Sequence, residues 1–246
     1  MKSAKERIYT AGLVVIGNEI LSGRTEDKNI SYVATSLNQA GIRLNEVRVI
    51  PDIEDEIVFA INYFRERFDY IFTTGGIGPT HDDITTQSIA KAFGVKNILN
   101  QEAYNILLEF YGSPEKINES RIRMAYAPEG SELIYNSLSK APGFKKENVF
   151  ILAGVPKIMM SMIDSIIPTL DKGKPLKSLE VDAAIPEGTI ASSLSDIQDR
   201  YREVEIGSYP YYDNNKVGTV LVLRSTNEEI LEKAKNEVVL LIKRFT

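Results

Sequence analysis

Thiol and imidazole ligands are almost absent from this sequence of 246 residues, which contains no cysteine and a single histidine, His81. The lack of cysteine excludes disulfide bonds and thiolate zinc sites, and one histidine cannot build an imidazole-rich metal centre. Any bound metal ion is therefore expected to be a hard cation held by oxygen ligands, such as Mg²⁺.

Long apolar runs and clusters of positive charge are also missing. The longest apolar stretches, such as residues 13–16 and 149–153, are far too short to span a bilayer, and residues 1–7 are not followed by the apolar core of a signal peptide. The net charge is −5, with both signs interspersed, whereas nucleic-acid-binding proteins usually show a basic face. We therefore expect a cytoplasmic protein with no nucleic-acid or membrane partner.

Short apolar runs alternate with amphipathic segments, which predicts an α/β fold with a largely parallel sheet. Before a polar boundary at residues 171–175, the pattern predicts a domain over residues 8–170. Its expected strands cover residues 13–17, 44–50, 70–74, 132–135 and 148–153, and its expected helices cover 28–39, 53–64, 84–94, 101–111, 115–125 and 157–170.

Beyond that boundary the pattern predicts a small α+β domain over residues 176–246, with a βαββα order. Its expected elements are a strand at 179–183, a helix at 190–201, strands at 204–209 and 218–223, and a helix at 227–245. The polar residues 213–216 are expected to join the two later strands as a hairpin.

Three loops each follow a strand of the predicted parallel sheet, at residues 17–19, 51–52 and 74–83. Right-handed crossovers bring such loops to the same edge of the sheet, where open α/β sheets bind their ligands. Glu19, Asp52 and Asp83 are therefore expected to converge, although they lie far apart in the sequence.

The third loop contains the segment TTGGIGPT at residues 73–80. Three glycines allow the backbone to approach a phosphate closely, the following helix directs its positive end to the same place, and Thr74 and Thr80 offer hydroxyl groups. The segment matches neither a Walker loop nor a dinucleotide-binding fingerprint. Phosphate binding and a plain glycine-rich turn both remain open. On the first interpretation, replacing Gly76 with valine is expected to weaken ligand binding far more than the fold.

Each acid also has a structural alternative. Asp52 and Asp83 both stand at the start of an expected helix, where an aspartate can serve as an N-cap or favour the helix dipole. Glu19 can be a solvated loop residue. His81 is expected to be an exposed loop residue, and the tyrosines of residues 208–212 are expected to pack in the hairpin.

Five segments resemble the molybdopterin-binding superfamily, which includes MoaB, MogA, the third domain of MoeA, and CinA. Residues 73–85 resemble the superfamily signature, and residues 17–23, 27–29, 141–144 and 152–156 are similar to its CinA branch. The resemblance implies a three-layer α/β domain of the molybdopterin-binding type. The βαββα region resembles the KH-type module that follows this domain in CinA proteins, but it lacks a basic Gly-x-x-Gly loop, so RNA binding is not carried over.

The resemblance also implies roles for individual residues. It implies that Asp52 and Asp83 serve the chemistry and hold Mg²⁺, and that Glu19 positions or deprotonates a water molecule. In contrast to the related motif, the residue before Glu19 is Asn18 rather than an aspartate. The residues expected to bind the phosphate-bearing ligand are Gly17, Asn29, Thr74, Gly75, Gly76, Gly78 and Thr80.

The function implied by the resemblance is metal-dependent hydrolysis of a nucleotide pyrophosphate, with ADP-ribose or FAD as typical substrates. A molybdopterin-binding protein or adenylyltransferase of molybdenum cofactor biosynthesis is one alternative, and a non-enzymatic nucleotide- or pterin-binding protein is another. The deamidase activity of longer CinA proteins is not expected. The family also leads us to expect a homo-oligomer.

Overall fold

The computed structural model describes residues 7–213 and 216–245, and it divides into two compact units at Gly173 and Lys174. Each unit has its own hydrophobic core, and the two are described separately below. Within the described ranges, no helix has both the length and the apolar character needed to cross a membrane.

The first unit is built on a mixed sheet with the strand order β2-β1-β3-β8-β7-β6. Strands β2, β1, β3 and β8 run parallel, and β7 and β6 continue the sheet in antiparallel fashion. The strands are β1 (Tyr9–Ile16), β2 (Ile42–Ile50), β3 (Tyr70–Thr74), β6 (Glu132–Ile134), β7 (Gly143–Lys146) and β8 (Val149–Leu152). The predicted largely parallel sheet is thus confirmed.

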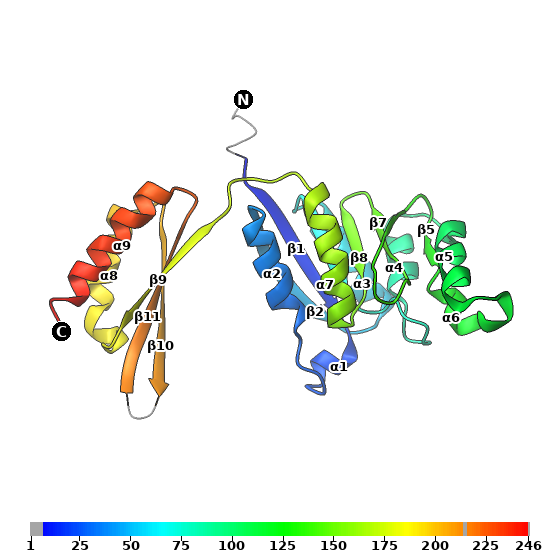
Figure 1. The fold of residues 1–246 in the computed structure, drawn as a ribbon, viewed down its shortest axis with the longest axis horizontal. Coiled ribbons are helices and arrows are strands. Elements are labelled where there is room, and N and C mark those ends of the chain that lie inside the picture. Colours follow the sequence, from blue (N-terminus) through cyan, green and yellow to red (C-terminus); the bar gives the residue numbers. More distant parts are fainter. Residues whose placement is uncertain (1–6, 214–215, 246) are drawn as a thin grey trace. The chain divides into compact units, whose positions relative to one another are not determined.

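Helices cover both faces of this sheet, which gives the unit three layers (Figure 1). The alternation along β1 shows why: Leu13 and Val15 pack with the core on the side of α2 and α7, whereas Val14 and Ile16 pack with the core on the side of α3 and α4. The covering helices are α2 (Asn29–Gln39), α3 (Glu54–Arg65), α4 (Thr85–Ala92) and α7 (Pro156–Ile166). The three-layer α/β architecture expected from the resemblance is confirmed.

A small excursion between α4 and β6 carries the remaining elements of this unit. They are β4 (Asn97–Leu99), α5 (Gln101–Tyr111), the 3-10 turn η2 (Pro114–Lys116), α6 (Glu119–Arg123) and β5 (Tyr126–Pro128). A continuous helix over 115–125 is wrong, because the side chain of Asn118 accepts a hydrogen bond from the backbone N–H of Arg121 and starts a new helix there.

Two further differences from the sequence interpretation have local causes. The helix predicted over 157–170 ends at Ile166, and a 3-10 turn η3 (Ile167–Thr169) follows, because Pro168 has no N–H to continue the helix. The pattern also missed β4, β5 and β7. Each has only three or four residues, too few for an alternation to be recognised.

The second unit has the predicted βαββα order. It contains β9 (Lys177–Ala183), α8 (Glu187–Arg200), β10 (Glu205–Asp213), β11 (Lys216–Ser225) and α9 (Glu228–Ile242). The antiparallel sheet has the order β10-β11-β9, and α8 and α9 cover one of its faces (Figure 1). β10 and β11 form the predicted antiparallel pair, while the central turn residues 214–215 lie outside the described residues.

Asp69 stabilises the start of β1, at the end of the sheet where the parallel strands β1 and β3 begin. Its carboxylate accepts hydrogen bonds from the backbone N–H of Thr10 (2.8 Å) and from the Thr10 hydroxyl (3.0 Å), and it pairs with Arg7. Burial alone would raise the pKa of Asp69, but the bonds from Thr10 and Arg7 outweigh it, so the pKa is lowered.

Replacing Asp69 with asparagine is expected to lower the free energy of unfolding at neutral pH by about 1–3 kcal/mol, because hydrogen bonds to a charged group are lost. A folded-state pKa below the unfolded value means that this stabilisation is present above about pH 4 and disappears as the pH falls through the folded pKa. Urea melts of parent and variant between pH 7 and pH 2 would check this. A difference that does not shrink on acidification would contradict the assignment.

Candidate functional site

The loops that follow β1, β2, β3 and β8 are joined at the carboxyl edge of the parallel strands. The N–H of Gly17 donates to the carbonyl of Ile50 at the end of β2 (3.1 Å), and the N–H of Gly75 donates to that of Leu152 at the end of β8 (3.2 Å). The short helix α1 (Asn18–Leu21) stands at this edge (Figure 1). The sequence argument placed the loops after β1, β2 and β3 correctly.

The first part of the glycine-rich loop is a tight turn that only glycine can form. Gly75 has φ +100° and Gly76 has φ +67°. A Cβ on Gly75 would lie 2.1 Å from the carbonyl oxygen of Ile16, which is far inside van der Waals contact. The turn therefore rests directly against the end of β1.

Thr85, at the start of α4, fixes the orientation of the peptides in this turn. Its hydroxyl donates to the carbonyl of Gly75 (2.9 Å), and its N–H donates to the carbonyl of Gly76 (2.9 Å). In a planar trans peptide the C=O and the next N–H point in opposite directions. The N–H groups of Gly76 and Ile77 are consequently turned away from Thr85, and among the described residues neither they nor the N–H of Gly78 have a hydrogen-bond partner.

The expectation for Gly76 needs correction. A Cβ at this position would lie 2.1 Å from the Thr85 hydroxyl oxygen, inside the protein rather than in the ligand space. Together with the positive φ, this means that a valine at position 76 would damage the fold as well as ligand binding. The backbone N–H, rather than the missing side chain, is what Gly76 can offer to a ligand.

A cleft of about 480 Å³ opens beside this turn. Its walls come from the glycine-rich loop, from α5 and Met124, and from the segments at 139–142 and 153–158. Among the described residues that line it, the charged side chains are Glu19 and Asp83, and there is no lysine or arginine. The cleft thus combines backbone N–H donors with two carboxylates.

Asp83 shapes the loop rather than the helix that follows. Its carboxylate accepts hydrogen bonds from the backbone N–H (2.7 Å) and the hydroxyl (2.5 Å) of Thr80. The N-cap of α4 is Ile84, with no side-chain cap, so the capping alternative for Asp83 is wrong. The Thr80 hydroxyl also bonds Asp82 and thereby lowers the pKa of Asp82. Thr80 does not line the cleft.

Asp52 lies outside the cleft lining. Its carboxylate accepts a hydrogen bond from the N–H of Asn18 (2.9 Å), at the start of the helix that carries Glu19. The N-cap of α3 is Ile53, so Asp52 is not that helix's cap either. Over the described ranges, no three Asp, Glu, His or Cys side chains gather closely enough to hold a metal ion. Glu19 and Asp83 therefore both line the cleft. Asp52 instead holds the start of α1, the helix that carries Glu19.

Asn29 and Thr74 are buried beneath the site, at 5% and 1% exposure. The Asn29 amide donates to the carbonyl of Gly154 (2.9 Å), and Gly154 packs against Gly75, since a Cβ on it would lie 3.1 Å from the Gly75 Cα. The side-chain oxygens of Asn29 and Thr74 have no partner within the described residues. Such buried polar atoms are usually satisfied by an ordered water or a ligand.

Gly17 and Gly78 make room for the two carboxylates of the cleft. A Cβ on Gly17 would lie 2.6 Å from a carboxylate oxygen of Glu19, and one on Gly78 would lie 2.7 Å from a carboxylate oxygen of Asp83. Both glycines therefore let an acidic side chain fold closely over the backbone. Gly78 itself lines the cleft.

The sequence interpretation did not assign the rest of the cleft wall. Ala141, Pro142 and Val155 belong to segments that resemble CinA proteins, so a signal for them existed. Phe110 and Tyr111 lie at the end of α5, three and four residues after the buried Leu107, and so on the same face of the helix. Their spacing is that of ordinary core residues, and Tyr111 does pack against the core, so the sequence pattern does not mark them as cleft residues.

Comparisons with known proteins cover both units of the chain. Residues 12–172 match the family described as the probable molybdopterin binding domain, and residues 175–244 match the one described as the FAD synthase middle domain. A protein of Archaeoglobus fulgidus is 34% identical over 226 residues, which are 92% of this chain and 93% of the relative. A protein of Saccharolobus islandicus is 34% identical, with 96% of each chain covered.

Among solved structures, the chain is similar to the protein CinA of unknown function from Thermoplasma acidophilum. The TM-score is 0.62 and the identity is 31%, with 66% of this chain and 98% of that chain covered. The resemblance to the CinA branch is thereby confirmed for the first unit.

Proposed function

The chain belongs to the family of the probable molybdopterin binding domain. Within this family, we propose that its cleft binds an ADP-ribose- or FAD-like dinucleotide and hydrolyses the pyrophosphate with the help of Mg²⁺. The observation that carries this proposal is the make-up of the cleft, with unpaired N–H groups from Gly76, Ile77 and Gly78 beside the carboxylates of Glu19 and Asp83. The match of the second unit to the FAD synthase middle domain supports a dinucleotide ligand.

The charges of the cleft support a cation. A phosphate within about 4 Å of a carboxylate is repelled by about 4 kcal/mol at the effective dielectric constant of a protein surface. Among the residues that line the described cleft, no lysine or arginine offsets this repulsion. A polyanion held by the glycine-rich loop therefore needs a counter-cation near Glu19 and Asp83.

The donor set fits Mg²⁺. Proteins usually bind this ion through one or two carboxylates and complete its shell with water and substrate phosphates. The cleft supplies two carboxylates and neither a histidine nor a cysteine, so Asp83, with Glu19 close by, would hold the ion together with the substrate phosphates. When bound, Mg²⁺ neutralises charge on the phosphoryl oxygens.

The residues of the chain then have separate tasks. The N–H groups of Gly76, Ile77 and Gly78 hold the phosphate oxygens, and Glu19 accepts the proton of the attacking water. Water adds to one phosphorus atom, and the bond from that phosphorus to the bridging oxygen breaks, which leaves two phosphate monoesters. Asp52 is a positioning residue, since it holds the start of α1 through Asn18. In this proposal Asp52 acts through α1, and not through the direct metal contact that the resemblance implies.

Chelation of Mg²⁺ is expected to stop this reaction. Chromatography of ADP-ribose and FAD incubated with the protein should show mononucleotide release with Mg²⁺, and at least about a hundredfold less with excess EDTA. A melt in the same EDTA buffer controls for unfolding. Equal release with and without EDTA would contradict the metal-dependent scheme.

Parallel incubations with ATP and molybdopterin, and binding measurements with a nucleotide and a pterin, separate the alternatives. Transfer of an adenylyl group from ATP to molybdopterin, without hydrolysis of either dinucleotide, would assign the chain to molybdenum cofactor biosynthesis, in line with the family description. Tight binding of a nucleotide or a pterin without any turnover would assign it to the non-enzymatic binding proteins.

A further inference from the structure

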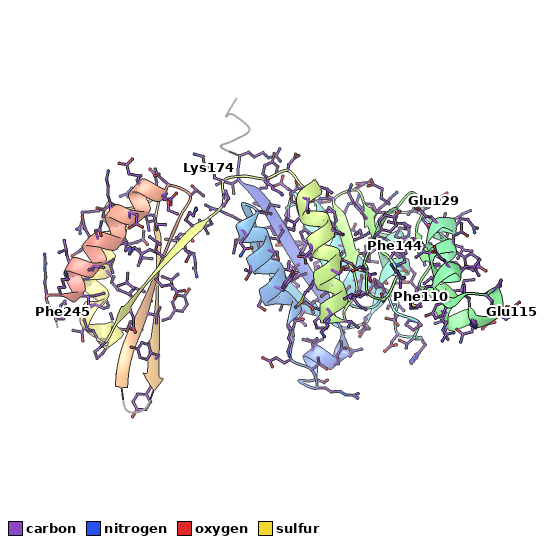
Figure 2. The ribbon with its side chains drawn as sticks, in the orientation of Figure 1. Phe110, Glu115, Glu129, Phe144, Lys174 and Phe245 are labelled. Atoms are coloured by element: carbon purple, nitrogen blue, oxygen red, sulfur yellow. The ribbon has the colours of Figure 1, made fainter. Side chains whose placement is uncertain are left out.

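A second cavity of about 830 Å³ opens next to the cleft in the first unit. It is a groove between α5, the segment 135–140 and α7. Phe110, labelled in Figure 2, lines both the groove and the cleft. A ligand that extends from the glycine-rich loop past Phe110 would enter this groove.

One short turn forms the wall between the two cavities. Ser139 and Ala141 line the cleft, whereas Ser137 and Lys140 line the groove. The buried side chain of Asn136 holds this turn, because its oxygen accepts from the N–H groups of Leu138 (3.1 Å) and Ser139 (2.8 Å), and its amide donates to the carbonyl of Ala141. The wall is therefore fixed in place before any ligand arrives.

The groove offers aromatic faces and one charged side chain of each sign, Lys140 and Glu109. Phe110 and Tyr135 are 52% and 55% exposed, so a ligand can reach both rings. The Tyr135 hydroxyl donates to Glu102 (2.6 Å), which holds the ring in place and raises the pKa of Tyr135. Lys140 lines the groove and has no ion-pair partner within the described part of the chain.

We propose that the groove binds the distal aromatic ring of the dinucleotide, stacked on Phe110 and Tyr135, and that it selects pyrophosphates with such a ring over ring-free ones. This inference rests on the function proposed above, since it takes the glycine-rich loop as the phosphate site. The volumes agree with it. The cleft of about 480 Å³ lies in the lower half of the range of small-molecule sites, about 300–1,000 Å³, and the groove adds the space that a second half of a dinucleotide needs.

Calorimetric titrations in magnesium buffer, with ADP-ribose supplied as its non-hydrolysable methylene-bridged analogue, can test this inference with two probes. ADP-ribose carries an aromatic base, and inorganic pyrophosphate does not. Tyr135→Ala is expected to weaken binding of ADP-ribose about tenfold or more, because a base–aromatic stack is lost, and to leave the affinity for pyrophosphate unchanged. Tyr135→Phe should restore most of the parent affinity, since it keeps the ring and loses only the hydroxyl bond to Glu102. Leu138→Ala is the matched control, because Leu138 is equally exposed on the same turn but lines neither cavity.

Several outcomes would overturn the inference. One is a Tyr135→Ala variant that binds both probes as the parent does, or that loses affinity for both equally. Another is a parent protein that binds neither probe. A change in oligomeric state on light scattering, with both affinities kept, would assign the groove to a second copy of the chain. In contrast, ring-dependent binding by a parent that releases no mononucleotide would support the groove and contradict only the proposed hydrolysis.

Discussion

Asp83→Asn is expected to reduce hydrolysis of a dinucleotide pyrophosphate by about a thousandfold, equivalent to about 4 kcal/mol of transition-state stabilisation. The substitution keeps the size of the side chain and one oxygen that can accept the hydrogen bonds from Thr80. It removes the negative charge that a hard cation requires. The melting temperature is therefore expected to stay close to that of the parent while turnover is lost.

Asp82→Asn is the matched control for this variant. It makes the same change of charge at the adjacent residue, which also bonds the Thr80 hydroxyl but does not line the cleft. We expect Asp82→Asn to keep most of the activity in a mononucleotide-release assay. If Asp83→Asn melts far below the parent and retains its specific activity, Asp83 serves only to hold the loop, and its assignment to the chemistry is wrong.

Gly75→Ala is expected to destabilise the first unit by at least about 4 kcal/mol, near the upper end of single-residue effects. The new Cβ would lie 2.1 Å from the carbonyl oxygen of Ile16, and Gly75 also has φ +100°. The obstacle is backbone at the end of a buried strand, so it cannot rotate away as a side chain can. A thermal melt should show a fall of about 10 °C or more.

Gly94→Ala separates the two causes of that loss. Gly94 has φ +65°, but a Cβ there would meet no atom within 4 Å. It should therefore cost only the conformational penalty of about 1–2 kcal/mol for a left-handed residue. If the two variants melt at the same temperature, the contact between Gly75 and Ile16 has no special weight, and the tight turn is not held as described.

The residues that could be predicted from the sequence are those whose environment is set by neighbours along the chain. Strand β3 was predicted with its observed ends because an apolar run leads straight into glycines. The loops at its edge followed from the handedness of the crossovers. The rest of the cleft depends on segments that meet only in the folded chain. Phe110 lies on α5, in the segment between α4 and β6, and lines the cleft. The spacing of apolar residues in the sequence does not predict that contact.

The acids show the same limit at the level of single side chains. Their position after strands was predictable, but the direction of each carboxylate was not. The Asp52 carboxylate accepts a hydrogen bond from the N–H of Asn18, and of the three acids only Glu19 and Asp83 line the cleft. A spacing pattern fixes which loops are neighbours, whereas the hydrogen bonds of each loop decide which side chains face a ligand.

The bonds that lock the glycine turn have a consequence for the entropy of binding. Thr85 holds its carbonyls, Leu152 holds the N–H of Gly75, and Asn29 fixes Gly154 against it. A loop that is already ordered loses little freedom when a phosphate arrives, so more of each contact remains as affinity. The phosphate end of the site thus tolerates little change. A change of ligand preference is easier in the groove, where exposed side chains such as Tyr135 and Lys140 can be substituted without disturbing the glycine turn.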